Sequence, residues 1–253
     1  MSTTGFTAPA RGEGNMDEVT SLLARGLILA ALSGTALLLI HPILIWLASM
    51  TFNASPTVER HMAHYMSVRI WVIPAALANI TALGWLCGMQ SMRMGMVQLF
   101  VINLTSIGLN VLFVVGLDMD VTGVALASVI AQWVGLAVML WIIFRHRRRF
   151  QLKVIELSRN YLSTKPRWLA FVSVSRDLFL RTVMLWIVEA ILLAKAAKTG
   201  DVKLASIQII LIIFGFISFG LDGFAHTAEA MVGDRQGKGA FWDMKVVIWR
   251  NTQ

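Results

Sequence analysis

Six apolar stretches, each long enough to cross a lipid bilayer as a helix, most constrain what this chain of 253 residues can fold into. A spanning helix needs about 20 mainly apolar residues. The stretches cover residues 21–50, 67–88, 96–117, 121–144, 176–199 and 203–231. Because a bilayer offers no water to backbone polar groups, such stretches are predicted to be helical. The sequence therefore predicts an all-α, polytopic membrane helix bundle.

The composition excludes a soluble globular domain. Charged residues make up 14% of the chain and hydrophobic residues 57%, whereas a soluble domain carries about 25% charged residues. The net charge of +8 lies mostly in short segments between the apolar stretches, which is typical of membrane proteins and argues against nucleic acid as a partner. No P-loop or Gly-x-Ser-x-Gly motif is present, so we expect neither an enzyme nor a cofactor.

The distribution of basic residues predicts the orientation of the helices. With the N-terminus inside, sixteen lysines and arginines fall on the inner side and five on the outer side. Since positive residues concentrate on the cytoplasmic side, both ends of this chain are predicted to be cytoplasmic. The expected location is the plasma (inner) membrane, which the chain crosses several times. The dense basic run at residues 145–149 is expected to touch anionic lipid.

That basic run opens the longest connection between apolar stretches, residues 145–175. The connection contains Pro166 and shows little helical period. It divides the chain into residues 1–144, with four predicted spanning helices, and residues 176–253, with two. We therefore expect residues 145–175 to be a basic cytoplasmic linker between two unequal helical parts.

A short internal repeat accompanies this unequal division. Residues 7–14 resemble residues 227–239, and the Gly-x-Gly pairs that begin at Gly12 and Gly237 are separated by 225 residues. Repeated halves are a recurrent design of membrane transporters. The repeat predicts that the sixth helix is the counterpart of a helix preceding Gly12. It also predicts that the chain is an internal fragment of a protein of about two such periods.

Small and polar residues mark the candidate packing and functional positions. Gly84 and Gly88 have a small-xxx-small spacing that lets helices approach closely. Asn103, Ser106 and Asn110 follow one another at three and then four residues, so they share a helix face. This stripe could line a substrate or ion cavity, or it could form hydrogen bonds between helices.

The sixth stretch carries the other candidates. Asp222 and His226 lie one helical turn apart, with Glu229 on the same face. A charged residue inside a span is a functional candidate because inserting it is costly. Asp222 and His226 could instead form a structural pair. No HExxH motif is present, so no metal site is expected.

Several segments of the sequence resemble the MATE (multidrug and toxic compound extrusion) family of transporters, and within it the branch of the DNA-damage-inducible protein F. They include PAALAN at residues 74–79 and LGWLCGMQ at residues 83–90. The others are residues 103–104, 114–117, 121–127, 176–177 and 221–226. The resemblance extends over nearly the whole chain. It implies a fold of two six-helix lobes, of which this truncated chain would hold helices three to eight of about twelve.

The resemblance also implies a function. MATE proteins are antiporters that use an inward flow of H⁺ or Na⁺ to export drugs and other amphipathic, often cationic, organic compounds by alternating access. In this branch a polar cluster lies in the first lobe, and Asn79 and Asn103 match its pattern. Ser106 and Asn110 stand where the branch has an Asn and an Asp. Since neither side chain takes up a proton at physiological pH, this departure bears directly on the coupling mechanism.

Two alternatives remain open from the sequence. The chain could be a membrane protein that does not transport, either a fragment or a decayed copy, and Ser106, Asn110 and Glu189 favour this alternative. It could also belong to the lipid-linked precursor flippases of the same superfamily, which residues 221–226 argue against. Membrane lipids are expected partners in every case.

Overall fold

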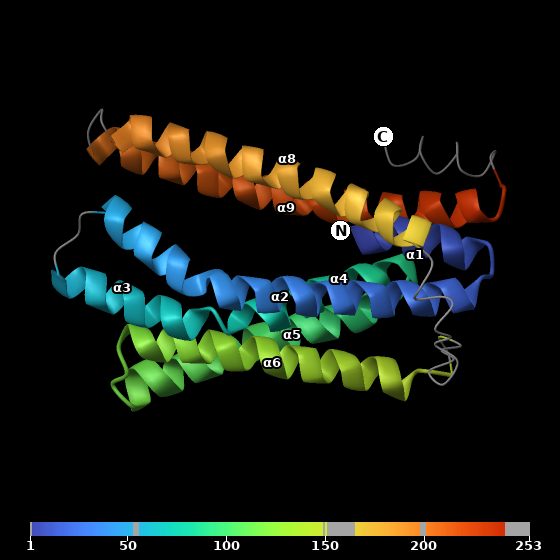
Figure 1. The fold of residues 1–253 in the computed structure, drawn as a ribbon, viewed down its shortest axis with the longest axis horizontal. Helices are drawn as coiled ribbons and strands as arrows, with labels where there is room; N and C mark the ends of the chain where they lie inside the picture. The colour runs from blue at the N-terminus through green and yellow to red at the C-terminus, as the bar shows by residue number, and fades with distance from the viewer. Residues whose placement is uncertain (1, 53–55, 149, 151–164, 198–200, 241–253) are drawn as a thin grey trace.

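The computed structural model describes residues 2–52, 56–148, 150, 165–197 and 201–240, and all regular structure in these ranges is helical. Figure 1 shows α8 and α9 side by side above a bundle that contains α2 to α6, with α1 next to the end of α9. The predicted all-α class is confirmed. The elements are α1 (Ser2–Gly12), α2 (Met16–Phe52), α3 (Pro56–Arg69), α4 (Val72–Gly88), α5 (Met92–Asn110), the π-helix η1 (Val111–Gly116), α6 (Val121–Arg145), α8 (Lys165–Ala197) and α9 (Asp201–Gly237).

Most of the predicted spans are present as long apolar helices. In the described part of the chain, Met16–Ile43, Met92–Gly116, Val121–Arg145 and Ala205–Gly237 are long and apolar enough to cross a membrane. Ala63–Arg69 and Val72–Gly88 add a fifth span, bent by 41°. α8 covers residues 176–197 of the predicted stretch 176–199 and is long enough. However, Arg181, Glu189 and Lys195 make it more charged than the other spans.

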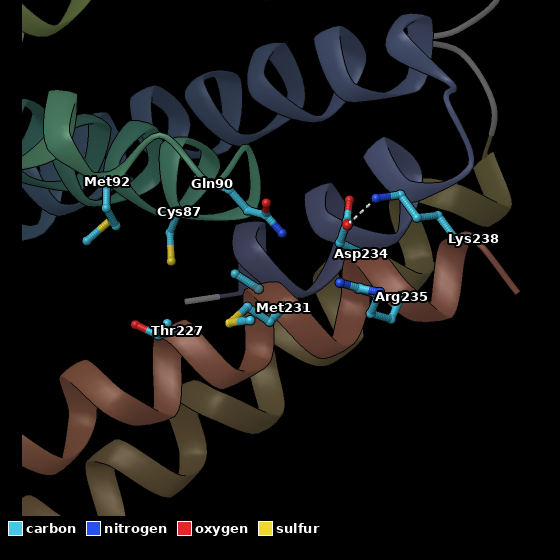
Figure 2. Close-up of a pocket in the computed structure, with 9 residues that line it drawn as sticks. Cys87, Gln90, Met92, Thr227, Met231, Asp234, Arg235 and Lys238 are labelled. Atoms are coloured by element: carbon cyan, nitrogen blue, oxygen red, sulfur yellow. Dashed lines mark hydrogen bonds and ion pairs between the residues drawn. The ribbon is translucent and has the colours of Figure 1, made fainter. Parts of the chain in front are cut away.

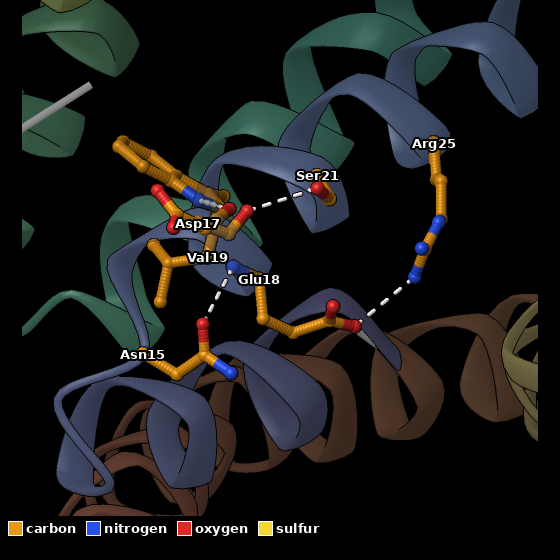
Figure 3. A network of polar contacts seen from close by, with 7 residues as sticks. Asn15, Asp17, Glu18, Val19, Ser21 and Arg25 are labelled. Atoms are coloured by element: carbon orange, nitrogen blue, oxygen red, sulfur yellow. Dashed lines mark hydrogen bonds and ion pairs between the residues drawn. The ribbon is translucent and has the colours of Figure 1, made fainter. Parts of the chain in front are cut away.

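The first spanning helix, α2, begins at Met16 and not at residue 21 as the hydropathy suggests. Asn15 accounts for the earlier start, because its Oδ1 accepts a hydrogen bond from the backbone N–H of Glu18 at 3.1 Å (Figure 3). Such a side-chain acceptor satisfies a donor that the first helical turn leaves unpaired. Further along α2, Arg25 is only 1% exposed and pairs with Glu18 Oε1 at 3.0 Å. The polar start of α2 is therefore stabilised within the helix itself.

α8 also begins earlier than predicted, at Lys165, within the stretch expected to be a linker. Pro166 was the loop signal, but proline is tolerated in a first helical turn, where its missing N–H would have no helical partner. Residue 149 and residues 151–164 lie outside the described residues. The division of the chain by a linker over 145–175 therefore stays a prediction.

α5 with η1 and α6 form an antiparallel hairpin of two 25-residue arms. A Cβ atom added to Gly123 would contact Phe113, and one added to Gly135 would contact Ile102. Moving twelve residues along α6 thus moves eleven residues back along α5, as expected for antiparallel helices of equal rise. This register brings Met92, the first residue of α5, level with Arg145, the last residue of α6.

The main hydrophobic core lies at one end of this bundle, where the N-terminal half of α2 packs against the C-terminal half of α4. Trp85 is fully buried there, and its indole N–H donates to the Val19 carbonyl at 2.9 Å. Phe150 packs edge-on against Trp85 with ring centroids 5.2 Å apart. Edge-to-face aromatic pairs contribute about 0.5–1.5 kcal/mol beyond area burial. The chain just after the basic run is therefore held in the core.

α1 lies between two helices that present glycines to it. On one side, Gly84 and Gly88 of α4 face Thr3 and Thr7, and the Thr4 hydroxyl donates to the Gly84 carbonyl at 3.0 Å. The small-xxx-small spacing is thus a packing site. The short polar helix that uses it was not recognised in the sequence.

On its other side α1 meets the C-terminal end of α9. A Cβ on Gly12 would clash with the Asp234 carbonyl, and a Cβ on Gly237 would clash with the Pro9 carbonyl. The repeat, with its separation of 225 residues, relates Gly12 to Gly237 and Pro9 to Asp234, so the two contacts are equivalent. α1 and the end of α9 therefore pack as two equivalent, parallel helices related by a local two-fold axis.

The two equivalent helices also end in the same way. Gly14 and Gly239 both adopt positive φ, at 74° and 68°. The following residues, Asn15 and Ala240, donate back to the carbonyls of Ala10 at 3.0 Å and Arg235 at 3.1 Å. This is the Schellman termination, in which glycine takes the left-handed position. The internal repeat inferred from Gly12 and Gly237 is therefore confirmed at this local level.

The glycine contact between α1 and α9 leads to a stability prediction. Gly237→Ala places a methyl group against the Pro9 carbonyl, and overpacking of this kind costs about 1–3 kcal/mol. The matched control is Gly223→Ala on the same helix, where nothing lies within 4 Å of the added atom. Thermal unfolding in detergent should show a lower midpoint for Gly237→Ala only. Equal midpoints for the two variants would contradict the close contact.

Candidate functional site

Three amide side chains from three helices form a cluster inside the bundle, which we call the amide cluster; Asn79 and Gln98 are buried in it and Gln132 is half-buried. Asn79 of α4 donates through Nδ2 to Gln132 of α6, reaching its backbone carbonyl and its Oε1, each at 2.9 Å. Gln98 of α5 donates through Nε2 to Asn79 Oδ1 at 2.7 Å. Asn79 is 5% exposed and Gln98 is 1% exposed. The cluster therefore joins α4, α5 and α6 through uncharged polar groups.

One acceptor of this amide cluster is left open. Gln98 Oε1 is buried and makes no hydrogen bond to any described residue. A buried amide oxygen without a partner costs about 1–3 kcal/mol. An amide oxygen can accept from a hydrogen-bond donor and can also act as a hard oxygen ligand for a cation. The cluster thus has one buried position able to receive a donor or a cation.

The predicted polar stripe on α5 is only partly brought together. Asn110 Nδ2 contacts the Ser106 hydroxyl at 3.4 Å, and both side chains are half-buried. Asn103 is exposed and donates to the Leu99 carbonyl of its own helix at 2.8 Å. None of these described bonds reaches another helix. The interpretation of the stripe as hydrogen bonds between helices therefore gains no support from the described contacts.

Asp222 and His226 lie on α9, a different part of the structure from the amide cluster. Asp222 is exposed. His226 Nδ1 lies 3.5 Å from Glu229 Oε2, and the His226 carbonyl is 3.6 Å from the Cys87 thiol of α4. His226 therefore sits where α9 meets α4. The described contacts place Asn79, the Ser106–Asn110 pair and His226 in three separate groups.

The sequence analysis did not identify Gln98 or Gln132, for different reasons. Gln98 lies five residues before Asn103, so it points to another face of α5 than the predicted stripe. Gln132 is the one amide in an apolar run of 24 residues, 121–144. A lone polar residue in a span usually faces the bundle interior. This signal was available, and it would have identified Gln132.

A cavity of about 410 Å³ lies between the α4–α5 turn and the C-terminal part of α9 (Figure 2). Asp234 is buried in its wall, and Lys238 Nζ approaches Asp234 Oδ2 to 2.6 Å. Gln90 lines the opposite side and adopts a φ of 53°. Among the described residues no group of three His, Cys, Asp or Glu side chains could hold a metal. The cavity is lined by Cys87, Gln90, Met92, Thr227, Ala230, Met231, Asp234, Arg235 and Lys238.

Comparison with known proteins gives one consistent family. Residues 1–113 match the family model described as MatE. The chain is 33% identical to the DNA damage-inducible protein F of Escherichia coli over 239 residues, which is 94% of this chain and 51% of that protein. It is 25% identical to the multidrug resistance protein MdtK of Klebsiella pneumoniae, over 97% of this chain and 54% of that protein. The chain thus spans about half the length of these relatives.

Solved structures share the fold. The structure of the Vibrio cholerae MATE transporter VcmN covers 99% of this chain with a TM-score of 0.75 and 17% identity, and the match takes in 56% of that protein. An outward-facing multidrug resistance MATE transporter matches with a TM-score of 0.73 and 17% identity, over 99% of this chain and 55% of that one. The helical bundle described above is therefore the MATE fold over about half of a transporter. The family-model match, the sequence relatives and the shared fold all relate this chain to the MATE family.

Proposed function

We propose that this chain forms part of a cation-coupled antiporter that exports amphipathic organic compounds, often cationic ones, by alternating access. The observation that carries the proposal is the amide cluster of Asn79, Gln98 and Gln132 within a MATE fold. Polar groups buried in a membrane bundle are costly and mark substrate or ion pathways. The open oxygen of Gln98 supplies such a pathway with an acceptor.

The chemistry of the cluster bears on the choice between H⁺ and Na⁺. Amides do not titrate at physiological pH, so they cannot carry a coupling proton. Their oxygens can help to coordinate Na⁺ or accept from an organic cation. A coupling proton would need a group that can bind and release it, and Asp222 and Glu229 of α9 are the acidic residues we propose for that role. Asn103, Ser106, Asn110 and His226 complete the proposed polar pathway.

The membrane setting of the proposed antiporter follows from its helices and charges. The chain is a multi-pass membrane protein of a transporter family. We place it in the plasma (inner) membrane with both ends of this chain in the cytoplasm, because basic residues gather on that side. In this setting it would act as a transporter and not as an enzyme.

A membrane protein that does not transport is the second candidate. The contact between Asn110 and Ser106 favours it, because the Asn110 amide donates to the Ser106 hydroxyl of the same helix and neither side chain carries a charge. A chain with this pair could keep the helices and lack ion coupling. Export measurements separate the two candidates.

The proposed export activity predicts a loss of dye from cells. Bacteria that lack their own efflux pumps and express this chain from a vector should accumulate less ethidium than cells with the empty vector. A protonophore should abolish the difference if H⁺ is the coupling ion. Removal of external Na⁺ should abolish it if Na⁺ is the coupling ion. Accumulation equal to the empty-vector cells, with the protein present in the membrane, would support the non-transporting alternative.

The open acceptor of the amide cluster predicts a selective loss of export in Gln98→Leu. A contact to a charged group contributes about 1.5–3 kcal/mol, so export at low substrate should fall roughly tenfold or more. Ser128→Ala is the control, because Ser128 of α6 lies outside the proposed pathway and its hydroxyl donates to the Val124 carbonyl of its own helix at 3.0 Å. Both variants should reach the membrane in native amounts. Full export by Gln98→Leu would exclude the cluster from the pathway.

A further inference from the structure

The end of the α5–α6 hairpin carries four exposed arginines. Arg145 ends α6, and Arg147 and Arg148 follow it in the turn. Arg93 lies at the start of α5, and the register of the hairpin puts it level with the end of α6. All four side chains are exposed. We call Arg93, Arg145, Arg147 and Arg148 the basic rim.

The basic rim is held in place by the core beneath it. Phe150, two residues after Arg148, is 2% exposed and packs edge-on against the buried Trp85. His146 Nδ1 lies 2.9 Å from the Ile142 carbonyl in the last turn of α6. The chain thus leaves α6 at Arg145 and is in the core again at Phe150. Arg147 and Arg148 are therefore held close to the end of α6.

Exposed apolar side chains lie immediately next to the basic rim, on the membrane side. Trp141 is 65% exposed and Phe144 is 54% exposed on α6, within one turn of Arg145. Met96 is exposed one turn after Arg93 on α5. Tryptophan is enriched at the level of lipid headgroups. The surface therefore changes from aromatic and apolar to strongly basic within about one helical turn.

We propose that the basic rim, together with Trp141 and Phe144, binds anionic phospholipid. Headgroup phosphates contact the four arginines, and the acyl chains lie against the two aromatic side chains. The occupant has to be both anionic and apolar, which fits a lipid and does not fit free phosphate or RNA. Arginine suits this role because its planar guanidinium forms paired hydrogen bonds to phosphate.

The site can be tested with the full chain in vesicles through the fluorescence of Trp141. Brominated lipid quenches tryptophan on contact, and the difference between the native chain and Trp141→Phe isolates the signal of Trp141. Each basic residue near an anionic surface contributes roughly fivefold in affinity. Arg147→Gln/Arg148→Gln should therefore lower the preference of Trp141 for brominated phosphatidylglycerol over brominated phosphatidylcholine by at least about fivefold.

Two controls keep the result specific. Arg176→Gln/Arg181→Gln removes the same charge from exposed positions on α8 and should leave the preference at Trp141 unchanged. If Arg147→Gln/Arg148→Gln also loses quenching by phosphatidylcholine, its fold is altered. The deciding measurement is then the quenching of the native chain in about 1 M NaCl. There the screening length is about 3 Å, and the preference for phosphatidylglycerol should disappear.

Three outcomes would overturn the proposal. The first is equal quenching of the native chain by the two brominated lipids. The second is an unchanged preference in Arg147→Gln/Arg148→Gln. The third is displacement of brominated phosphatidylglycerol by millimolar inorganic phosphate or by a short RNA, because a rim that binds either one recognises phosphate without the apolar part of a lipid.

Discussion

The position of α1 between two glycine faces determines how the rest of the structure is arranged. Gly84 and Gly88 bring α4 against one side of α1, and Gly237 brings α9 against the other. Without a hydrophobic driving force between helices in lipid, such close backbone approach is what makes helix association favourable. α9 contacts the bundle mainly through α1, with a smaller contact to α4. An eleven-residue helix thus holds α8 and α9 next to the bundle.

The same contact explains where the cavity and the local symmetry occur. Gly12 and Gly237 are equivalent positions of the repeat, and both helices end in the same hydrogen-bonded turn. The cavity opens next to this pair, where the α4–α5 turn meets α9. Its wall holds Asp234, which is equivalent in the repeat to Pro9. A carboxylate on one helix and a proline on the other therefore break the local symmetry of this contact.

The sequence was sufficient for the features that the bilayer imposes. Long apolar runs predicted the spans, because a helix pairs its own backbone N–H and C=O groups in hydrocarbon, where no water is present to do so. It was less informative where other forces decide. α1 is short and polar and depends on contacts with α4 and α9. α2 starts early because of a single cap at Asn15. The helical start of α8 at Lys165 was hidden by Pro166, which a first turn tolerates.

The candidate site was predictable only in part, because spacing shows which residues share a face but not which face meets another helix. Asn79 was recognised, and its partners Gln98 and Gln132 were not. Asn103 looked equivalent to them in sequence, yet it is exposed and bonds to its own helix. The amide cluster depends on the relative rotation of α4, α5 and α6. That rotation is set by packing of small residues such as Gly135 against Ile102.

The charged residues on α8 and α9 pose a separate physical problem. Glu189 and Asp222 are exposed near the middle of long helices. A charge facing hydrocarbon at such a depth costs about 2.5–3.5 kcal/mol on insertion scales, far more than a half-buried amide. Lipid tails are therefore not a stable environment for these two carboxylates. In the membrane they must face water or polar protein surface. In the proposed transport pathway the amide cluster would supply neutral ligands, and Asp222 of α9 would supply the acid.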